Sequence, residues 1–240
     1  MKNSLDFYLD DLDDLEYDDE EAYYQKVSED ALGDDNPTAF FVLGRMYLEG
    51  YYVNQDFEKA FKYFRFAHKY SNGEMDLGTF CQCIHNQRDN IVWTEAGRES
   101  YMEFLEYLSE NDGPSSLIIL ADEYGFGEAV DKDVAMKIDL LETARRRGVT
   151  FANACLGEMY FLGEEVEKDY RKAYEYLLEA NEKETTIKDY YLGEMYRLGI
   201  IFDQDENEAI KHYEKVIETG FPMDDHYQKA SARLKELEDE

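Results

Sequence analysis

The sequence repeats itself with a period of 36 residues. The segment Leu156–Gly163 (Leu-Gly-Glu-Met-Tyr-Phe-Leu-Gly) recurs as Leu192–Gly199, and related segments lie at Leu120–Gly127 and Leu43–Gly50. A degenerate copy begins at Leu77 and lacks the closing Gly. A fixed period of this length is the signature of a repeat fold, in which each unit buries its apolar face against its neighbours. We therefore expect a stack of like units.

Each unit is predicted to hold two helices, A and B. Thirteen residues after each clear leading Leu stands an Asp, a favoured N-cap whose carboxylate accepts hydrogen bonds from the first free N–H groups of a helix. These residues are Asp56, Asp133, Asp169 and Asp205. After Asp169, Ala173, Tyr176, Leu177 and Ala180 follow at the spacing of one apolar helical stripe. In the degenerate copy Thr94 takes the capping position, after an insertion around residues 85–92.

Two sets of glycines belong to helix A. One set follows its last turn, where a left-handed residue is favoured, and consists of Gly50, Gly127, Gly163 and Gly199. The Gly of Leu-Gly lies in the middle of the helix, where Gly costs about 1 kcal/mol relative to Ala. We expect helix B or the next helix A to approach closely at this Gly. Its replacement by Ala121 in one copy fits a requirement for small size.

The pattern Leu-Gly-x-Met-Tyr-x-x-Gly, followed by Asp-x-x-Lys-Ala, resembles the Sel-one-like repeat (SLR) family, a relative of the tetratricopeptide repeat. The second part is matched best by residues 169–173. The resemblance implies an all-α fold, a right-handed superhelical solenoid of about five helix-turn-helix repeats. It also implies an adaptor, because members of the family mostly act as adaptors with varied partners.

The predicted organisation has three parts: an acidic N-terminal arm and capping helix (1–36), the solenoid (37–220) and a C-terminal capping helix (222–240). The repeats are expected at about 37–73, 74–113, 114–149, 150–185 and 186–221. A lone helix B is predicted over 21–32, with Ala22, Tyr23, Val27 and Leu32 as its apolar positions. The mostly polar C-terminal segment suits the open end of a stack. The first 20 residues are interpreted as a solvated, frayed helix or as an acidic-aromatic interaction arm.

Acidity limits the partners. The chain holds 56 Asp and Glu against 25 Lys and Arg, a formal charge of −31. This charge argues against direct binding to nucleic acid or to anionic membranes, and it favours a protein or peptide with a basic surface. Simple solvation of the surface is the alternative. The chain has no long apolar stretch and no apolar signal segment, and its three cysteines (Cys81, Cys83 and Cys155) are an odd number without the spacing of a disulfide framework. These features predict a reduced, cytoplasmic setting.

No motif predicts a metal, a cofactor or catalysis. Cys81, Cys83 and His85 form the only Cys/His cluster, but on a helix Cys83 points away from the other two. The ladder Asp203-x-Asp205-x-Asn207 lacks the Gly of a calcium loop and is better explained by a helix cap. The four His residues have no nucleophile in matching repeat positions. The chain is therefore predicted to be non-enzymatic.

The partner is expected on the concave surface. The residues that face it are those of helix A that stand two before the leading Leu, two after it, and five or six after it; the same position taken from successive repeats forms a column on this surface. The predicted binding residues are Phe41, Arg45, Leu48, Glu49, Asp122, Phe126, Glu158, Phe161, Tyr190, Glu194 and Arg197. They mix aromatic side chains with carboxylates, which suits a basic and apolar peptide or protein. The alternative for each aromatic residue is packing between repeats.

These features favour a scaffold or adaptor with an acidic, aromatic groove. A second hypothesis is an acidic inhibitor or immunity-type protein that blocks a basic, nucleic-acid-binding enzyme, because the charge is concentrated partly in the N-terminal arm. An enzyme is the third, and a deep pocket holding a His with a carboxylate partner would support it.

Overall fold

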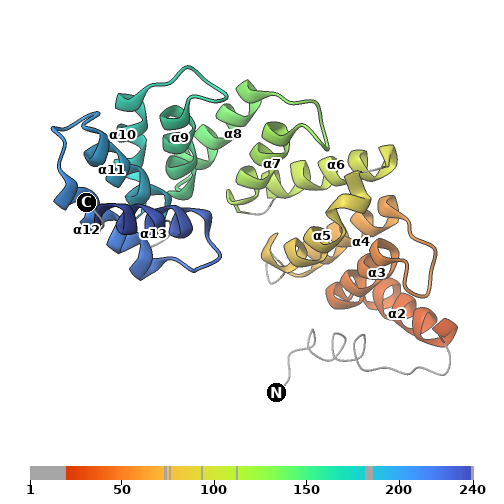
Figure 1. Cartoon of the computed structure of the whole chain (residues 1–240). Helices are drawn as coiled ribbons and strands as arrows, with labels where there is room; N and C mark the ends of the chain where they lie inside the picture. Colours follow the sequence, from red (N-terminus) through yellow and green to blue (C-terminus); the bar gives the residue numbers. More distant parts are fainter. Residues whose placement is uncertain are drawn as a thin grey trace. The chain divides into compact units, whose positions relative to one another are not determined.

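Every described element of the chain is a helix in the computed structural model (Figure 1). The structure describes residues 20–72, 75, 77–92, 94–111, 113–181 and 186–238. The arm predicted before residue 20 and the side chains of Cys81 and His85 lie outside this described part. The chain divides into an N-terminal unit (1–132) and a C-terminal unit (133–240), and each is treated by itself. The predicted all-α fold class is confirmed.

The N-terminal unit stacks helices in sequence order. Its helices are α2 (Glu20–Asp34), α3 (Pro37–Glu49), α4 (Phe57–Tyr70), α5 (Leu77–Val92), α6 (Glu95–Asn111) and α7 (Ser116–Phe126). Helix α2 packs on α3, and α3 packs on α4, while α6 contacts α4, α5 and α7. The buried stripe of α2 is Tyr23, Val27 and Ala31, whereas Ala22 and Leu32 are exposed, because the stripe follows every fourth residue.

The C-terminal unit has the same order of packing. Its helices are α8 (Val134–Arg146), α9 (Phe151–Leu162), α10 (Tyr170–Glu179), α11 (Ile187–Leu198), α12 (Glu206–Thr219) and α13 (Asp225–Glu238). Helix α9 packs on α8, α10 and α11, and α11 packs on α12. The last helix, α13, packs on α12 and α11 and buries Ala230 in the core of this unit. Its other side chains are largely polar, as expected of a terminal helix.

The predicted caps are confirmed at the end of helix A and at the start of helix B. The Asp carboxylates accept a hydrogen bond from the backbone N–H three residues on: Lys59 at 3.0 Å, Met136 at 2.9 Å, Lys172 at 3.0 Å and Glu208 at 3.1 Å. The glycines after helix A are left-handed, with φ of 75° at Gly50, 74° at Gly127, 67° at Gly163 and 63° at Gly199. Local sequence therefore sets where each helix begins and ends.

The glycine of Leu-Gly lies where helix B comes closest. A Cβ added at Gly44 would lie 2.4 Å from Phe64, and one at Gly157 would lie 2.7 Å from Leu177. At these distances a side chain on either glycine would force Phe64 or Leu177 to shift, so the requirement for small size is confirmed. The contacting residue stands 21 positions after the leading Leu in the three clear repeats with this glycine: Phe64, Leu177 and Tyr213.

The tyrosine and lysine of the repeat pattern belong together. Tyr47 stacks on Tyr63 at 5.7 Å between ring centroids, and Tyr160 stacks on Tyr176 at 5.8 Å. The Lys of Asp-x-x-Lys-Ala lies over the first ring of each pair, with Lys59 5.0 Å and Lys172 4.0 Å from the centroid. Lysine over an aromatic face is attracted by the ring quadrupole. The pattern therefore encodes a cation–π contact that ties helix B to helix A.

The insertion of the degenerate copy lengthens helix α5. That helix runs without a break to Val92, and Thr94 accepts a hydrogen bond from the Gly97 N–H at 3.1 Å, as its predicted capping role requires. The inserted residues 85–92, about two helical turns, carry Arg88 and Asp89 beyond the end of an ordinary helix A. This departure from the repeat positions the residues discussed next.

We expect Asp169→Ala to lower the free energy of unfolding by about 1 kcal/mol, because the Lys172 N–H loses its acceptor. Urea unfolding followed by circular dichroism measures the change. The matched control is Asp203→Ala, an exposed loop residue, for which we expect less than about 0.5 kcal/mol. Equal effects of the two substitutions would show that the cap contributes nothing.

Candidate binding surface

Two of the predicted binding residues in the N-terminal unit are core residues. Phe41 is buried between Phe64, at 5.7 Å, and Phe80, at 5.8 Å between ring centroids, and Leu48 is fully buried. For these two side chains the packing alternative holds, because α4 and α5 both cover that face of α3. They stabilise the repeat and do not reach the surface.

The remaining predicted residues of this unit reach the surface to different extents. Arg45 and Glu49 form an ion pair at 2.9 Å along α3, and both side chains are largely covered. Asp122 is half-buried on α7. Phe126, at the end of α7, is 65% exposed, although the Arg88 guanidinium lies 5.6 Å from its ring centroid. Phe126 is thus the most open of the predicted residues.

Arg88 joins α5 to α7. Its guanidinium donates to both carboxylate oxygens of Glu123, at 3.2 and 3.0 Å, and to Glu128 at 2.7 Å. Hydrogen bonds to Glu123 raise the pKa of Arg88 above its ordinary value, against the opposing effect of burial. Glu123 is buried and also accepts a hydrogen bond from the Tyr101 hydroxyl at 2.9 Å. Sequence reasoning missed this cluster because Arg88 lies in the insertion and has no counterpart in the other repeats.

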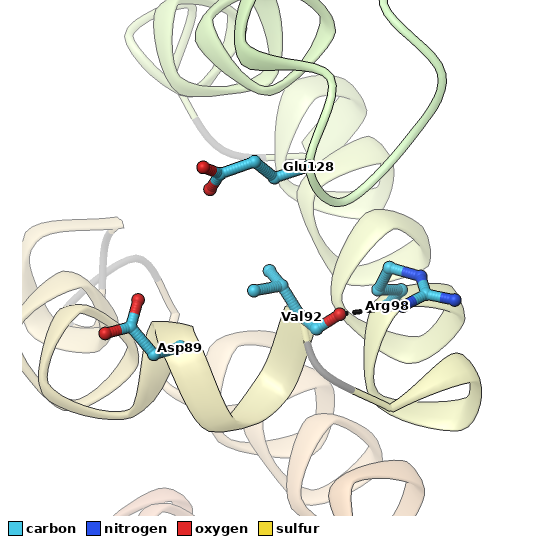
Figure 2. Close-up of a pocket in the computed structure, with 4 residues that line it drawn as sticks. All are labelled: Asp89, Val92, Arg98 and Glu128. Atoms are coloured by element: carbon cyan, nitrogen blue, oxygen red, sulfur yellow. Dashed lines mark hydrogen bonds between the residues drawn. The ribbon is translucent and has the colours of Figure 1, made fainter.

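An open cavity of about 450 Å³ lies beside this cluster (Figure 2). The described residues that line it are Asp89 and Val92 of α5, Arg98 of α6 and Glu128 after α7. Arg98 donates to the Val92 carbonyl at 2.8 Å. In Figure 2 the carboxylates of Asp89 and Glu128 lie on one side of Val92, while the Arg98 guanidinium lies on the other. The cavity therefore combines an apolar wall with two carboxylates.

In the C-terminal unit, Phe161 and Tyr190 are also core residues. The Phe161 ring lies 4.7 Å from the Tyr191 centroid and 5.2 Å from the Tyr170 centroid. Tyr190 packs against Tyr191, at 5.1 Å between ring centroids, and is buried. The packing alternative holds for both, as it does for Phe41 and Leu48.

Glu158 links three helices of this unit. Its carboxylate accepts a hydrogen bond from the Tyr191 hydroxyl at 2.7 Å and lies 3.2 Å from His226 Nε2. His226 stands on α13 and has the Asp224 carboxylate 3.6 Å from its Nδ1. Burial alone would raise the pKa of Glu158, but the hydrogen bonds from His226 and Tyr191 outweigh it and lower this pKa.

Glu194 and Arg197 are paired with each other. The buried Glu194 carboxylate accepts hydrogen bonds from Arg197 at 2.7 Å, from the Tyr213 hydroxyl at 2.6 Å and from Arg233 at 3.1 Å. Burial would raise the pKa of Glu194, but the donors, Arg197 first among them, hold it below its ordinary value. Arg233 and His226 were not predicted, because α13 reads in the sequence only as a polar terminal helix. Both carboxylates of the predicted columns are thus engaged within their own unit.

We expect the stabilising effect of Glu158 to depend on pH. Its pKa is lower in the folded chain than the ordinary 4.5, so the ionised carboxylate stabilises the fold above that value, and the effect is lost as pH falls through the folded-state pKa. Glu158→Gln should therefore be less stable than the unmodified chain at pH 7, with a difference that shrinks between about pH 5 and pH 3. Urea unfolding over this range measures it.

The matched control for this pH dependence is Glu175→Gln on α10, which replaces an exposed carboxylate. Its stability relative to the unmodified chain should vary little with pH. A difference for Glu158→Gln that stays constant from pH 7 to pH 3 would contradict the assignment.

The described residues offer no metal centre. Among them, no group of three or more His, Cys, Asp or Glu side chains is placed to hold an ion. Asp205 caps α12, so the capping interpretation of the calcium-like ladder is confirmed. Two histidines do pair with carboxylates, His226 with Glu158 and Asp224, and His212 with Asp189 at 3.0 Å, but none of these residues lines the cavity of Figure 2. Among the described helices, none has the length and apolar character that a membrane span requires.

Three segments of the chain match the family model named Sel1 repeat, at residues 39–67, 152–184 and 189–218. The chain contains Sel1 repeats. The matches cover α3 with α4, α9 with α10, and α11 with α12. The Sel1 matches leave out residues 68–151, which hold the degenerate copy, Arg88 and the cavity.

Solved structures of Sel1 repeat proteins are similar to this chain. A Sel1 repeat protein from Oxalobacter formigenes is 24% identical, with a TM-score of 0.55 over 78% of this chain and 75% of that chain. The antigen c5321, described as protective and as present in uropathogenic Escherichia coli strains, displays an SLR fold. It is 23% identical, with a TM-score of 0.47 over 83% of this chain and 50% of that chain. No curated protein is similar enough to this chain to count as a match.

Proposed function

We propose that this protein is a non-enzymatic interaction scaffold that binds a protein or peptide through the helix A faces of its Sel1 repeats. Sel1 repeat proteins generally mediate protein–protein interactions, which supports the class of function. One observation supports the surface. The residue six positions after the leading Leu is large, apolar and exposed in three copies: Phe126 at 65%, Leu162 at 37% and Leu198 at 49%. Packing within the repeats does not explain these side chains.

The partner in this proposal presents basic and apolar groups. Accessible carboxylates and a total charge of −31 favour a basic surface and disfavour direct contact with nucleic acid or an anionic membrane. Of the predicted binding residues, Arg45, Glu49, Asp122, Phe126, Glu158 and Arg197 remain in the proposal. The five buried ones, Glu194 among them, act by holding the helices. A cytoplasmic location is proposed with it, because the three cysteines are an odd number and lack the spacing of a disulfide framework.

The test is capture of partners from host lysate with three baits. The double variant Leu162→Asp/Leu198→Asp places charges on the exposed apolar positions and should lose a partner that the unmodified chain retains. The matched control is Leu178→Asp, which changes a 52% exposed leucine of helix B in the same unit. A partner retained by the double variant, or lost equally from both variants, would contradict the proposed surface.

The second candidate function, an acidic inhibitor of a basic enzyme, is favoured by the charge of the first 35 residues, where about 14 are acidic and two are basic. A bait that lacks residues 1–20 separates the two. A nucleic-acid-binding enzyme that needs this segment and releases in high salt supports the inhibitor. A partner that survives high salt and ignores the segment supports the scaffold.

A further inference from the structure

The inserted residues of α5 line a cavity in the N-terminal unit. None of the described residues that line this cavity lies in a segment that matches the Sel1 repeat. Asp89 and Val92 both lie within the inserted residues 85–92, so the cavity of Figure 2 is a product of the insertion. Its volume of about 450 Å³ is ample for one long side chain. The cavity is open to solvent on the side of Asp89 and Glu128, both of which are exposed.

We propose that this cavity binds a lysine or arginine side chain of the partner protein. The inference rests on the scaffold function proposed above and names the chemistry of one contact. The aliphatic stem of the partner residue lies on Val92, and its cationic head lies between the carboxylates of Asp89 and Glu128. Long basic side chains suit such a site because their stems are apolar and their heads stay partly hydrated.

The cations of this unit do not neutralise the two carboxylates fully. Arg98 is turned toward the Val92 carbonyl, on the other side of Val92 from the carboxylates. Arg88 reaches Glu128 through one nitrogen only, while its other donors are held by the buried Glu123. The Asp89 carboxylate has no hydrogen bond or ion pair with another described residue. A cation from outside therefore finds Asp89 and the second oxygen of Glu128 available.

Phe126 extends the surface next to the cavity. Arg88 connects the two, because it binds Glu128 and lies over the Phe126 ring. A partner segment that places a basic side chain in the cavity thus has an exposed aromatic ring beside it for an apolar neighbour. Aromatic residues rimmed by charged groups are frequent anchors of protein interfaces.

The test uses small probes and methyl NMR on the full chain. Methyl-labelled protein is titrated at low ionic strength with N-acetyl-arginine methylamide, N-acetyl-lysine methylamide and the neutral N-acetyl-citrulline methylamide. We expect the Val92 methyl signals, assigned with Val92→Ile, to shift saturably with the arginine and lysine compounds and not with the citrulline compound. Asp89→Asn and Glu128→Gln should each weaken the binding about two- to fivefold, because each removes one partly exposed charge pair.

Glu110→Gln, an exposed carboxylate at the far end of α6, is the matched control and should leave the titration unchanged. Val92 signals that stay fixed, that shift equally with citrulline, or that respond equally in Asp89→Asn would overturn the proposal. This outcome is separate from failure of the scaffold function, which is judged by partner capture with the Leu162 and Leu198 variants.

Discussion

Replacing Arg88 with methionine is expected to lower the free energy of unfolding of the N-terminal unit by about 3 kcal/mol or more. Arg88 donates two hydrogen bonds to Glu123, whose side chain is only 4% exposed. Without the guanidinium, the buried carboxylate keeps the Tyr101 hydroxyl as its remaining described partner. An uncompensated buried charge is costly because it has lost its hydration as well as its counterion. Urea unfolding followed by the fluorescence of Trp93, the only tryptophan, measures the change.

Two further variants show whether the effect comes from the orphaned charge. Adding Glu123→Gln to Arg88→Met should restore most of the stability, because the neutral amide can still accept from Tyr101. Arg65→Met removes a cation from a more exposed pair with Glu103, at 3.2 Å, and should cost less than about 1 kcal/mol. If Arg88→Met and Arg65→Met have equal effects, the cluster around Glu123 does not hold α5 to α7.

The parts of the fold that the sequence predicts are those that depend on local chemistry. A cap such as Asp169 and a left-handed Gly163 act on the backbone within three or four residues. The helix end that each one sets therefore does not depend on the neighbouring helix. Repetition at a fixed period then carries the same assignment from copy to copy. The helix boundaries follow for this reason even where the sequence between the signals varies.

Exposure of the binding columns could not be predicted in the same way. Phe41 and Phe126 both belong to the predicted columns of helix A, yet one is enclosed by α4 and α5 and the other is open. Which outcome applies depends on the helices that follow in the chain and on their lengths. The period of the sequence predicts that a further helix packs beside helix A. It does not predict how much of the column that helix covers.

The degenerate copy illustrates the same limit for charged residues. Arg88 and Glu123 lie 35 residues apart, and Glu123 stands one position after the column that was expected to face a partner. The contact between them depends on the inserted residues 85–92, which extend α5 beyond the end of an ordinary helix A. A departure from the repeat therefore indicates where new contacts arise within the chain, but it does not predict which residues form them.

Replacing Gly193 with valine is expected to give the second large loss of stability, about 2–3 kcal/mol in the C-terminal unit. A Cβ on Gly193 would lie 2.6 Å from Tyr213 Cε1 and 2.9 Å from Cδ1. The ring is fully buried, and its hydroxyl donates to Glu194, so it has little freedom to withdraw. The substitution must therefore separate α11 from α12 or break the Tyr213–Glu194 hydrogen bond.

Gly33→Val is the matched control, because Gly33 also lies within a helix and no atom comes within 4 Å of its added Cβ. We expect a change of less than about 0.5 kcal/mol there, since Val and Gly differ little in helix propensity. Hydrogen exchange read over α11 and α12 locates the effect of Gly193→Val, which should be faster exchange in both helices. Protection that remains as in the unmodified chain would show that the repeat tolerates a larger residue at this position. The close approach would then not be what keeps glycine there.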